Sequence, residues 1–275
     1  MVYPNTKNVN TTWTTKMIDW NDAFQNGAYI DGAADYITRW TDAAAAFRAS
    51  HTDAALDQSY GPNPRNRYDL FRAPNAKGTV IFVHGGYWHQ LDKSYWSHLA
   101  AGQLAHGWNV AFPEYTLAPD ARISQITSEI ATAVSTIADG PVRLTGHSAG
   151  GHLVSRMNCT NIDVAATIEH TVSISGVHDL RPLISTDMNE TLLLDAAEAQ
   201  AESPAFATAK PNTSITFWVG TAERPEFLRQ NRIIAENWSR SGINATDHYD
   251  QNHHHFSVIE PMADPNSPLT KELLK

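Results

Sequence analysis

Cysteine is nearly absent from this sequence of 275 residues, in which Cys159 is the only one. One thiol cannot form an internal disulfide, so the fold cannot depend on the disulfide framework that many small secreted domains use. Long hydrophobic runs are absent too, since no apolar stretch approaches the roughly 20 residues that a membrane-spanning helix needs. We therefore expect a chain that is stabilised by a large apolar core and has no membrane partner.

Positive charge is also in short supply. The 20 Lys and Arg residues are outnumbered by 29 Asp and Glu residues, which gives a formal net charge of -9. The basic residues are scattered, so the basic stripe that binds a phosphate backbone is missing and we expect no nucleic-acid partner. The first residues, 1–5, contain neither the basic nor the apolar segment of a secretory signal peptide, which predicts a cytoplasmic protein. The sequence leaves homo-oligomerisation open.

The spacing of apolar residues changes near the end of the first 60 residues. Up to that point they recur at helical spacing, for example at Trp20, Phe24 and Trp40, which predicts a helical N-terminal arm over residues 1–60. Beyond it, short apolar runs alternate with helix-length segments, a pattern typical of a mostly parallel sheet with helices on both faces. The composition, 42% hydrophobic and 18% charged, suits a single α/β domain over residues 1–275.

The alternation allows individual elements to be predicted. Strands are expected over residues 67–72, 79–83, 108–112, 142–145, 171–175, 215–219 and 245–249. Helices are expected over residues 95–106, 123–138, 149–158 and 225–241. The segment 181–211 has no strand pattern, so we predict that it forms a small insertion over the sheet.

The strongest motif follows the predicted strand at 142–145, where the chain reads Gly-His-Ser-Ala-Gly-Gly over residues 146–151. Glycines flank Ser148 because a sharp turn from a strand into a helix leaves no room for a Cβ two residues away. Such a turn raises the serine hydroxyl above the carboxyl edge of the sheet, and the following helix directs its first N–H groups toward it. We predict that Ser148 is the nucleophile of a serine hydrolase with the α/β-hydrolase fold.

A second glycine-containing loop lies upstream, where the apolar run 80–83 leads into His-Gly-Gly-Tyr-Trp. A tetrahedral intermediate needs two or three N–H donors that converge on one oxygen, and glycine lets the backbone approach closely. The backbone N–H groups of Gly86 and Tyr87, with that of Ala149, are the predicted oxyanion hole. His84 ends the strand, so we expect it to shape the loop through hydrogen bonds rather than to act as a base.

A serine nucleophile needs a base and an acid, which follow it in this fold in the order acid, then histidine. Glu223 comes directly after the predicted strand at 215–219 and is the expected acid. Asp179, after the strand at 171–175, is the alternative, although Asp residues in such turns often cap nearby N–H groups. Asp250 is too near the histidine loop to orient a base.

Three consecutive histidines, 253–255, follow the last predicted strand. We predict that His255 is the base, because the neighbouring Phe256 is apolar and can anchor it. A run of histidines also suggests a metal site. Adjacent side chains point in different directions, however, and no further ligand follows at zinc-type spacing, so we expect no metal and no cofactor.

The motifs at 84–88, 146–151, 175–180 and 255–260 resemble the kynurenine formamidase (arylformamidase) branch of the α/β-hydrolases, which is close to the hormone-sensitive-lipase-like esterases. The resemblance runs over nearly the whole chain. It implies a Ser-Asp-His triad in which Glu223 takes the aspartate position and His255 is the histidine of the His-Phe pair. It also places Tyr87 where the His-Gly-Gly-Gly esterases have a third glycine.

The resemblance implies hydrolysis of an aryl formamide such as N-formylkynurenine, or of a small acyl ester, through an acyl-enzyme. Tyr87 and Trp88 are expected to stack on an aryl leaving group, with core packing as the alternative for both. Two other functions stay open: a general short-chain carboxylesterase, and a catalytically silent homologue that binds a ligand in the same cleft. The partner expected in each case is a small molecule.

Overall fold

The computed structural model describes residues 17–275 and contains an eight-stranded sheet in the order β1-β2-β4-β3-β5-β6-β7-β8. The strands are β1 (Ala55–Ser59), β2 (Arg67–Phe71), β3 (Thr79–Val83), β4 (Asn109–Pro113), β5 (Val142–His147), β6 (Ile168–Ile174), β7 (Ser214–Gly220) and β8 (Asn244–Asp250). β2 pairs antiparallel with both β1 and β4, and every later pairing is parallel. The predicted mostly parallel α/β sheet is therefore confirmed.

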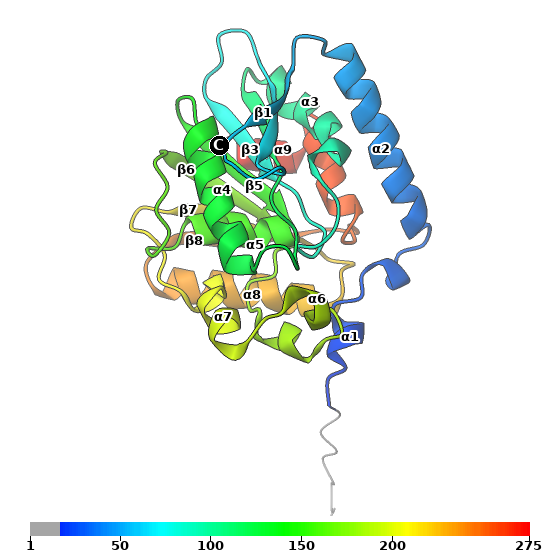
Figure 1. Cartoon of the computed structure of the whole chain (residues 1–275), viewed down its shortest axis with the longest axis vertical. Helices are drawn as coiled ribbons and strands as arrows, with labels where there is room; N and C mark the ends of the chain where they lie inside the picture. Colours follow the sequence, from blue (N-terminus) through cyan, green and yellow to red (C-terminus); the bar gives the residue numbers. More distant parts are fainter. Residues whose placement is uncertain (1–16) are drawn as a thin grey trace, which may run out of the picture.

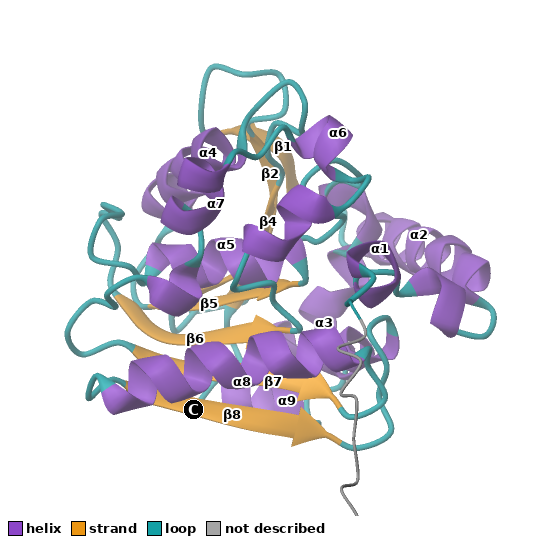
Figure 2. Cartoon of the chain, turned by 90° about the horizontal axis from the view of Figure 1, so that it is seen from below, coloured by secondary structure: helices purple, strands orange, loops and turns teal. Residues whose placement is uncertain are grey.

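Helices cover both faces of this sheet (Figures 1 and 2). They are α1 (Trp20–Ala23), α2 (Ala33–Ser50), α3 (Ala101–Ala105), α4 (Ile123–Ile137), α5 (Ala149–Met157), α6 (Asn189–Leu192), α7 (Ala196–Ala201), α8 (Pro225–Arg240) and α9 (Pro268–Leu273). Side chains alternate across β3, so Ile81 and Val83 pack in the core under α4 and α5, whereas Val80 and Phe82 pack with residues of α2 and α9. This two-faced burial explains why the central strands read as continuous apolar runs.

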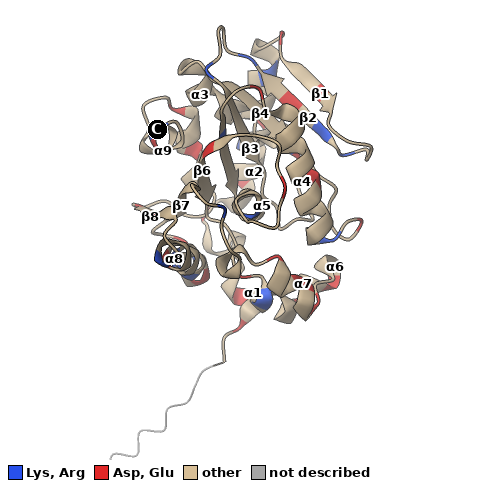
Figure 3. Ribbon diagram, turned by 90° about the vertical axis from the view of Figure 1, so that its left-hand side faces the viewer, with Lys and Arg blue, Asp and Glu red and all other residues tan. Residues whose placement is uncertain are grey.

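Charged residues of both signs lie on α8, as the interspersed blue and red segments of Figure 3 show. Arg229 pairs with Glu226 at 2.7 Å and Arg240 approaches Glu236 at 3.7 Å, one helical turn apart in each case. The buried side of α8 carries both apolar and polar residues: Phe227 belongs to the core, and Gln230 and Asn231 are fully buried beside it. None of the helices in residues 17–275 combines the length and the apolar character that crossing a membrane requires.

The N-terminal arm differs from the prediction in one element. α1 and α2 are helical as expected, but β1 lies inside the range 1–60 that was predicted to be helical throughout. Four of the five β1 side chains are exposed because it is an edge strand, so it has no apolar alternation that a sequence pattern could reveal. The first 16 residues of the predicted arm lie outside the described residues.

The segment predicted as one helix over 95–106 is broken into two short 3₁₀ turns followed by α3. The break occurs at Trp96, whose backbone is not helical (φ -120°, ψ -3°). Its ring packs against Trp40 of α2 and Phe82 of β3, with centroid separations of 4.8 and 5.9 Å. Tertiary packing of one large aromatic side chain therefore overrides the helical pattern.

The segment 181–211 folds as short helical pieces, including α6 and α7, and its secondary structure contains no strand. It packs beside α4, where the Glu198 carboxylate accepts hydrogen bonds from the Ser124 N–H (3.1 Å) and from Arg122 Nε (2.7 Å). Figure 1 shows these pieces gathered at the end of the molecule nearest α1.

Candidate active site

The turn between β5 and α5 has the sharp geometry that its sequence predicts. Ser148 adopts φ 56° and ψ -116°, a strained conformation for a residue with a side chain. A Cβ added to Gly150 would lie 1.9 Å from the carbonyl oxygen of Val83, and one added to Gly146 would lie 2.5 Å from the Gly150 oxygen. Both glycines are therefore required for the turn to pass so close to β3.

Glu223 and His255 form a buried pair. Glu223 Oε2 lies 2.8 Å from His255 Nδ1, and the two side chains are 0% and 5% exposed. The other carboxylate oxygen, Oε1, accepts hydrogen bonds from the Gly220 N–H (3.2 Å) and from the Ser175 hydroxyl. Because a carboxylate accepts from Nδ1–H, the neutral imidazole keeps Nε2 free to take a proton.

Ser148 and His255 line the same cavity, which has a volume of about 100 Å³. No hydrogen bond joins the Ser148 hydroxyl to His255 among those between residues 17 and 275. Catalytic hydrogen bonds often tighten only when substrate is bound, so this arrangement needs a turn of the serine hydroxyl toward Nε2 before proton transfer.

The loop after β3 runs against the nucleophile. A Cβ added to Gly85 would lie 2.8 Å from the His147 carbonyl oxygen and 3.1 Å from the Cβ of Ser148. Gly86 has φ 109° and Tyr87 has φ 51°, so the loop turns back sharply. The N–H groups of Gly86, Tyr87 and Ala149 donate to no acceptor in the described part of the chain, which leaves all three available to an oxyanion.

Trp88 does not lie where it was expected. It is fully buried, its indole N–H donates to His152 Nδ1 at 3.3 Å, and it does not line the cavity at Ser148. Trp88 also has a positive φ, 60°, and the reversed loop turns its side chain into the core under α5. The prediction that Trp88 contacts the leaving group is therefore wrong, and core packing is its role.

Tyr87 lines the cavity, as predicted, but its hydroxyl is engaged elsewhere. The hydroxyl donates to the Phe24 carbonyl at 2.8 Å and accepts from Asn26 Nδ2 at 3.1 Å. Tyr87 thus ties the segment after α1 to the oxyanion loop and presents only part of its ring to a ligand.

The rest of the cavity wall is mostly apolar and comes from segments far apart in the sequence. Seven further residues line it: Ile37, Trp40, Gln90, Leu91, Trp96, His147 and Phe256. The sequence patterns gave no signal that Leu91 or Trp96 would line the cavity. Their places depend on the broken segment before α3, which local patterns do not reveal.

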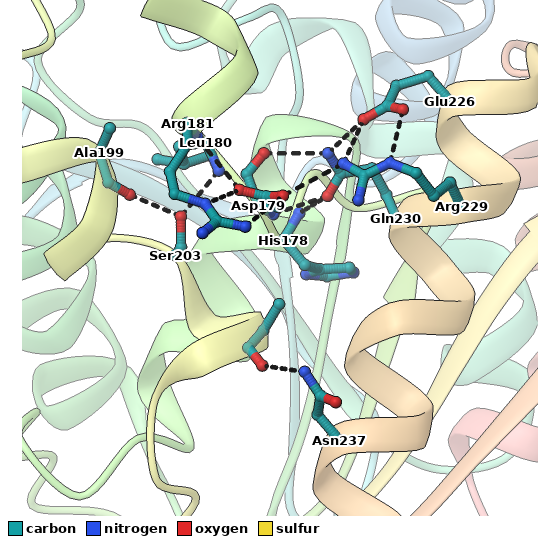
Figure 4. Close-up of polar contacts among 11 residues, drawn as sticks. His178, Asp179, Leu180, Arg181, Ala199, Ser203, Glu226, Arg229, Gln230 and Asn237 are labelled. Atoms are coloured by element: carbon teal, nitrogen blue, oxygen red, sulfur yellow. Dashed lines mark hydrogen bonds and ion pairs between the residues drawn. The ribbon is translucent and has the colours of Figure 1, made fainter. Parts of the chain in front are cut away.

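Asp179, the alternative acid, is engaged in a separate network (Figure 4). Its carboxylate pairs with Arg181 at 2.8 Å and with Arg229 at 3.3 Å, and it accepts from the Arg181 N–H at 3.3 Å. Burial raises the pKa of Asp179, but the hydrogen bond and charge of Arg181, with the charge of Arg229, outweigh burial and hold the pKa below its usual value. Asp179 therefore caps its turn, and the carboxylate that reaches His255 is that of Glu223.

Neither His84 nor the other two histidines of the run 253–255 has the contacts of a base. His84 stacks on Tyr115 with ring centroids 4.3 Å apart, its Nδ1 lies 2.7 Å from the Gly85 oxygen, and burial lowers its pKa to about 4. This is the loop-shaping arrangement expected for His84. His254 Nε2 lies 3.1 Å from the Tyr36 hydroxyl of α2. Within residues 17–275 no cluster of three or more His, Cys, Asp or Glu side chains could hold a metal ion.

The comparison with known families agrees with this geometry. A family described as having the alpha/beta hydrolase fold matches residues 80–257, from β3 to just beyond His255. The chain therefore belongs to the α/β hydrolases.

Within that class, the chain is similar over most of its length to kynurenine formamidases. It is 29% identical to the kynurenine formamidase of Danio rerio, with 82% of this chain and 83% of that protein covered. It is 30% identical to that of Salmo salar, with 80% and 81% covered. The resemblance indicated by the motifs is confirmed, and it identifies the chain as a hydrolase.

A solved structure resembles the chain more strongly still. It is that of a protein from Silicibacter sp. TM1040 to which thioesterase activity has been assigned provisionally. The two are 47% identical, with a TM-score of 0.90 over 94% of this chain and 100% of the other.

Proposed function

We propose that this chain is a serine hydrolase that cleaves an aryl formamide such as N-formylkynurenine through a formyl-enzyme. The observation that carries the proposal is the buried pair of Glu223 and His255, joined at 2.8 Å, whose His255 lines the same small cavity as Ser148. A base oriented by a carboxylate beside a strained serine is the arrangement that activates a hydroxyl nucleophile.

In the first half of the reaction, His255 Nε2 removes the Ser148 proton and Ser148 Oγ attacks the formyl carbon. The negative charge that develops on the carbonyl oxygen is stabilised by the free N–H groups of Gly86, Tyr87 and Ala149. His255 then gives its proton to the leaving nitrogen, the C–N bond breaks, and Ser148 carries the formyl group as an ester.

In the second half, His255 takes a proton from water, and the resulting hydroxide attacks the formyl ester. The ester bond breaks, formate leaves, and the proton returns from His255 to Ser148. Glu223 holds the tautomer of His255 and stabilises its protonated form in both halves. The cycle uses only side chains and backbone groups of this chain and needs no cofactor.

The size of the cavity favours a substrate with a small acyl group. Its volume of about 100 Å³ is less than the ~150 Å³ of an apolar cavity that accommodates benzene, so a formyl group fits beside Ser148 more readily than a bulky acyl group. The aromatic rings of Trp40, Trp96 and Phe256 line the cavity and provide apolar surfaces for an aryl group. The names of the fish relatives support the same substrate class.

A short-chain ester or thioester is the second candidate. The provisional thioesterase assignment of the Silicibacter protein favours it, and the same triad can attack an ester carbonyl. The third alternative, a silent ligand-binding homologue, is disfavoured by the full set of nucleophile, base, acid and free N–H donors.

Two measurements test the proposal. A serine-directed phosphonate should add once, at Ser148, and abolish turnover, and Ser148→Ala should lose activity by at least about 10³-fold. Turnover of N-formylkynurenine and of p-nitrophenyl acetate on the same preparation then distinguishes amide from ester hydrolysis. An unmodified Ser148, or full activity in the alanine variant, contradicts the serine mechanism. Turnover of the ester alone contradicts the formamide substrate.

A further inference from the structure

His147, the residue before the nucleophile, has one ring nitrogen committed to the protein and one that is not. The side chain is almost completely buried, with 4% of the residue exposed, and Nε2 lies 2.8 Å from the carbonyl oxygen of His255. A carbonyl oxygen only accepts, so Nε2 carries the hydrogen. Burial, together with the charge of His255, lowers the pKa of His147 well below its usual value. The ring is therefore neutral at pH 7 and Nδ1 is a hydrogen-bond acceptor.

The position of Nδ1 places this acceptor beside the reacting groups. His147 lines the cavity, and no donor in the described part of the chain binds its Nδ1. A Cβ added to Gly85 would lie 3.3 Å from Nδ1 and 3.1 Å from the Cβ of Ser148. The His147 ring also packs beside the ring of His255, with a centroid separation of 4.6 Å. Nδ1 thus lies among the nucleophile, the base and the oxyanion loop.

His147 Nδ1 is accessible from the cavity and has no partner among the described residues, so a ligand in the cavity can supply the donor. We infer that His147 Nδ1 accepts a hydrogen bond from the N–H of the scissile amide. This inference rests on the proposed function, because it concerns the amide that Ser148 attacks, and it makes His147 a determinant of amide over ester cleavage.

The chemistry of amide cleavage gives this hydrogen bond a purpose. When Ser148 attacks, the amide nitrogen becomes pyramidal, and its lone pair must face His255 Nε2 to receive the proton. The N–H then points away from His255 and needs an acceptor of its own. An ester has an oxygen at this position, whose lone pairs would face the lone pair of His147 Nδ1. The same nitrogen that stabilises a departing amine therefore offers nothing to a departing alcohol.

The test uses two variants that separate the two nitrogens of His147. In His147→Gln, the side-chain NH₂ reaches about as far as Nε2 and can still donate to the His255 carbonyl, while the Nδ1 acceptor is lost. In His147→Asn, the side-chain oxygen takes the place of Nδ1 and the donor to His255 is lost. The substrates are formanilide and phenyl formate, which produce the same formyl-enzyme and differ only in N–H against O.

The readout is the ratio of kcat/KM for formanilide to kcat/KM for phenyl formate. In His147→Gln we expect this ratio to fall by about tenfold or more, because only the amide loses a hydrogen bond to Nδ1. In His147→Asn we expect both values to fall together and the ratio to remain, because only the position of the His255 loop is disturbed. An unchanged ratio in His147→Gln overturns the inference.

A second test uses the unaltered chain, so its result does not depend on whether a variant folds. N-methylformanilide lacks the N–H and should be cleaved at least about tenfold more slowly than formanilide. Equal rates overturn the inference and leave the proposed function standing. A parent protein that cleaves phenyl formate but not formanilide contradicts the proposed amide function itself, so the two failures give different results.

Discussion

Glu223, the proposed acid, lies at the position for which the family resemblance implies an aspartate, and the surrounding residues accommodate it. One carboxylate oxygen binds His255 and the other is held by Ser175 and Gly220, so the longer side chain is fixed at both oxygens. Such a carboxylate keeps the base in one orientation without needing to take its proton. The additional methylene is therefore accommodated by specific contacts rather than by flexibility.

Replacing the Glu223 carboxylate with an amide should greatly lower the rate of catalysis. In Glu223→Gln we expect kcat to fall by roughly 10³ to 10⁴-fold, because the amide no longer fixes the Nδ1–H tautomer of His255. Steady-state kinetics with p-nitrophenyl acetate measure the loss, and circular dichroism should show an unchanged fold.

Asp179→Asn is the matched control for this prediction. It loses the ion pairs with Arg181 and Arg229 but touches neither His255 nor Ser148. We expect kcat within about threefold of the parent value and a free energy of unfolding lower by about 1 kcal/mol, since the pairs are only partly buried. The opposite pattern, an inactive Asp179 variant with an active Glu223 variant, would transfer the acid role to Asp179.

At the scale of single residues the sequence is informative, because the proposed nucleophile, acid and base each follow a strand in a known order. It fails where the direction of a side chain depends on the backbone around it. Trp88 adjoins the oxyanion loop in sequence, yet three consecutive positive φ values from Gly86 turn it into the core. The contact between the Ser175 hydroxyl and Glu223 also depends on the backbone, because Ser175 has a φ of 50°. No sequence motif predicts this contact.

Among the helices, α2 contributes side chains to the cavity wall. Ile37 and Trp40 lie on one side of this helix and form part of the cavity wall. Trp40 packs on Trp96 and Phe256 with centroid separations of 4.8 and 5.4 Å, and so fixes the helix against the rest of the wall. Ile37 is less enclosed, which makes it the better position for changing the cavity.

Shortening Ile37 should widen the range of substrates. In Ile37→Ala we expect kcat/KM for p-nitrophenyl butyrate to rise several-fold relative to that for the acetate, because three carbon atoms leave the wall of a cavity of about 100 Å³. The free energy of unfolding should fall by about 1 to 2 kcal/mol, less than for a fully buried residue.

Ile37→Leu, which keeps the volume, should leave the ratio of the two esters as it is. An alanine variant with the parent ratio would mean that this part of α2 does not contact the acyl chain.

The buried central strands were the most predictable elements. β3 and β5 to β7 appear close to the predicted ranges, because strands covered on both faces carry apolar runs. β8 was also predicted, although it is an edge strand with four exposed side chains out of seven. β1, at the other edge, was missed, and the segment 95–106 was predicted wrongly because Trp96 leaves the helix to pack with Trp40. Long-range packing of this kind has no local signature in the sequence.

The molecule as a whole buries many histidines in neutral form. Burial lowers the pKa of His84 and His170 to about 4 and that of His152 to about 3. It also holds the pKa values of His147 and His178 well below the usual value. In the unfolded chain these groups titrate near pH 6.5, so below that pH the unfolded state binds more protons than the folded state.

Stability should therefore fall with acid before the carboxylates begin to protonate. The contribution of each buried neutral histidine is present above about pH 6.5 and decreases by up to about 1.4 kcal/mol per pH unit as the pH falls toward its folded pKa. Urea denaturation at pH 7, 6 and 5 should give a steadily lower free energy of unfolding.

A His170→Asn variant should lose stability less steeply over the same range, because one group no longer titrates. His170 lies outside the cavity, so the variant should retain the parent activity at pH 7. A free energy of unfolding that stays constant from pH 7 to pH 5 would contradict neutral burial of these rings.

The separation of α2 from the reacting groups along the chain has a consequence for how this protein can change over evolutionary time. α2 ends at Ser50, whereas the proposed nucleophile, base, acid and oxyanion loop all lie after Val83. A recombination event between residues 50 and 83 would replace one side of the cavity in a single step. The residues proposed to react with the substrate would remain unchanged. New substrate preferences can thus be sampled by exchanging a contiguous piece of sequence, without passing through inactive intermediates.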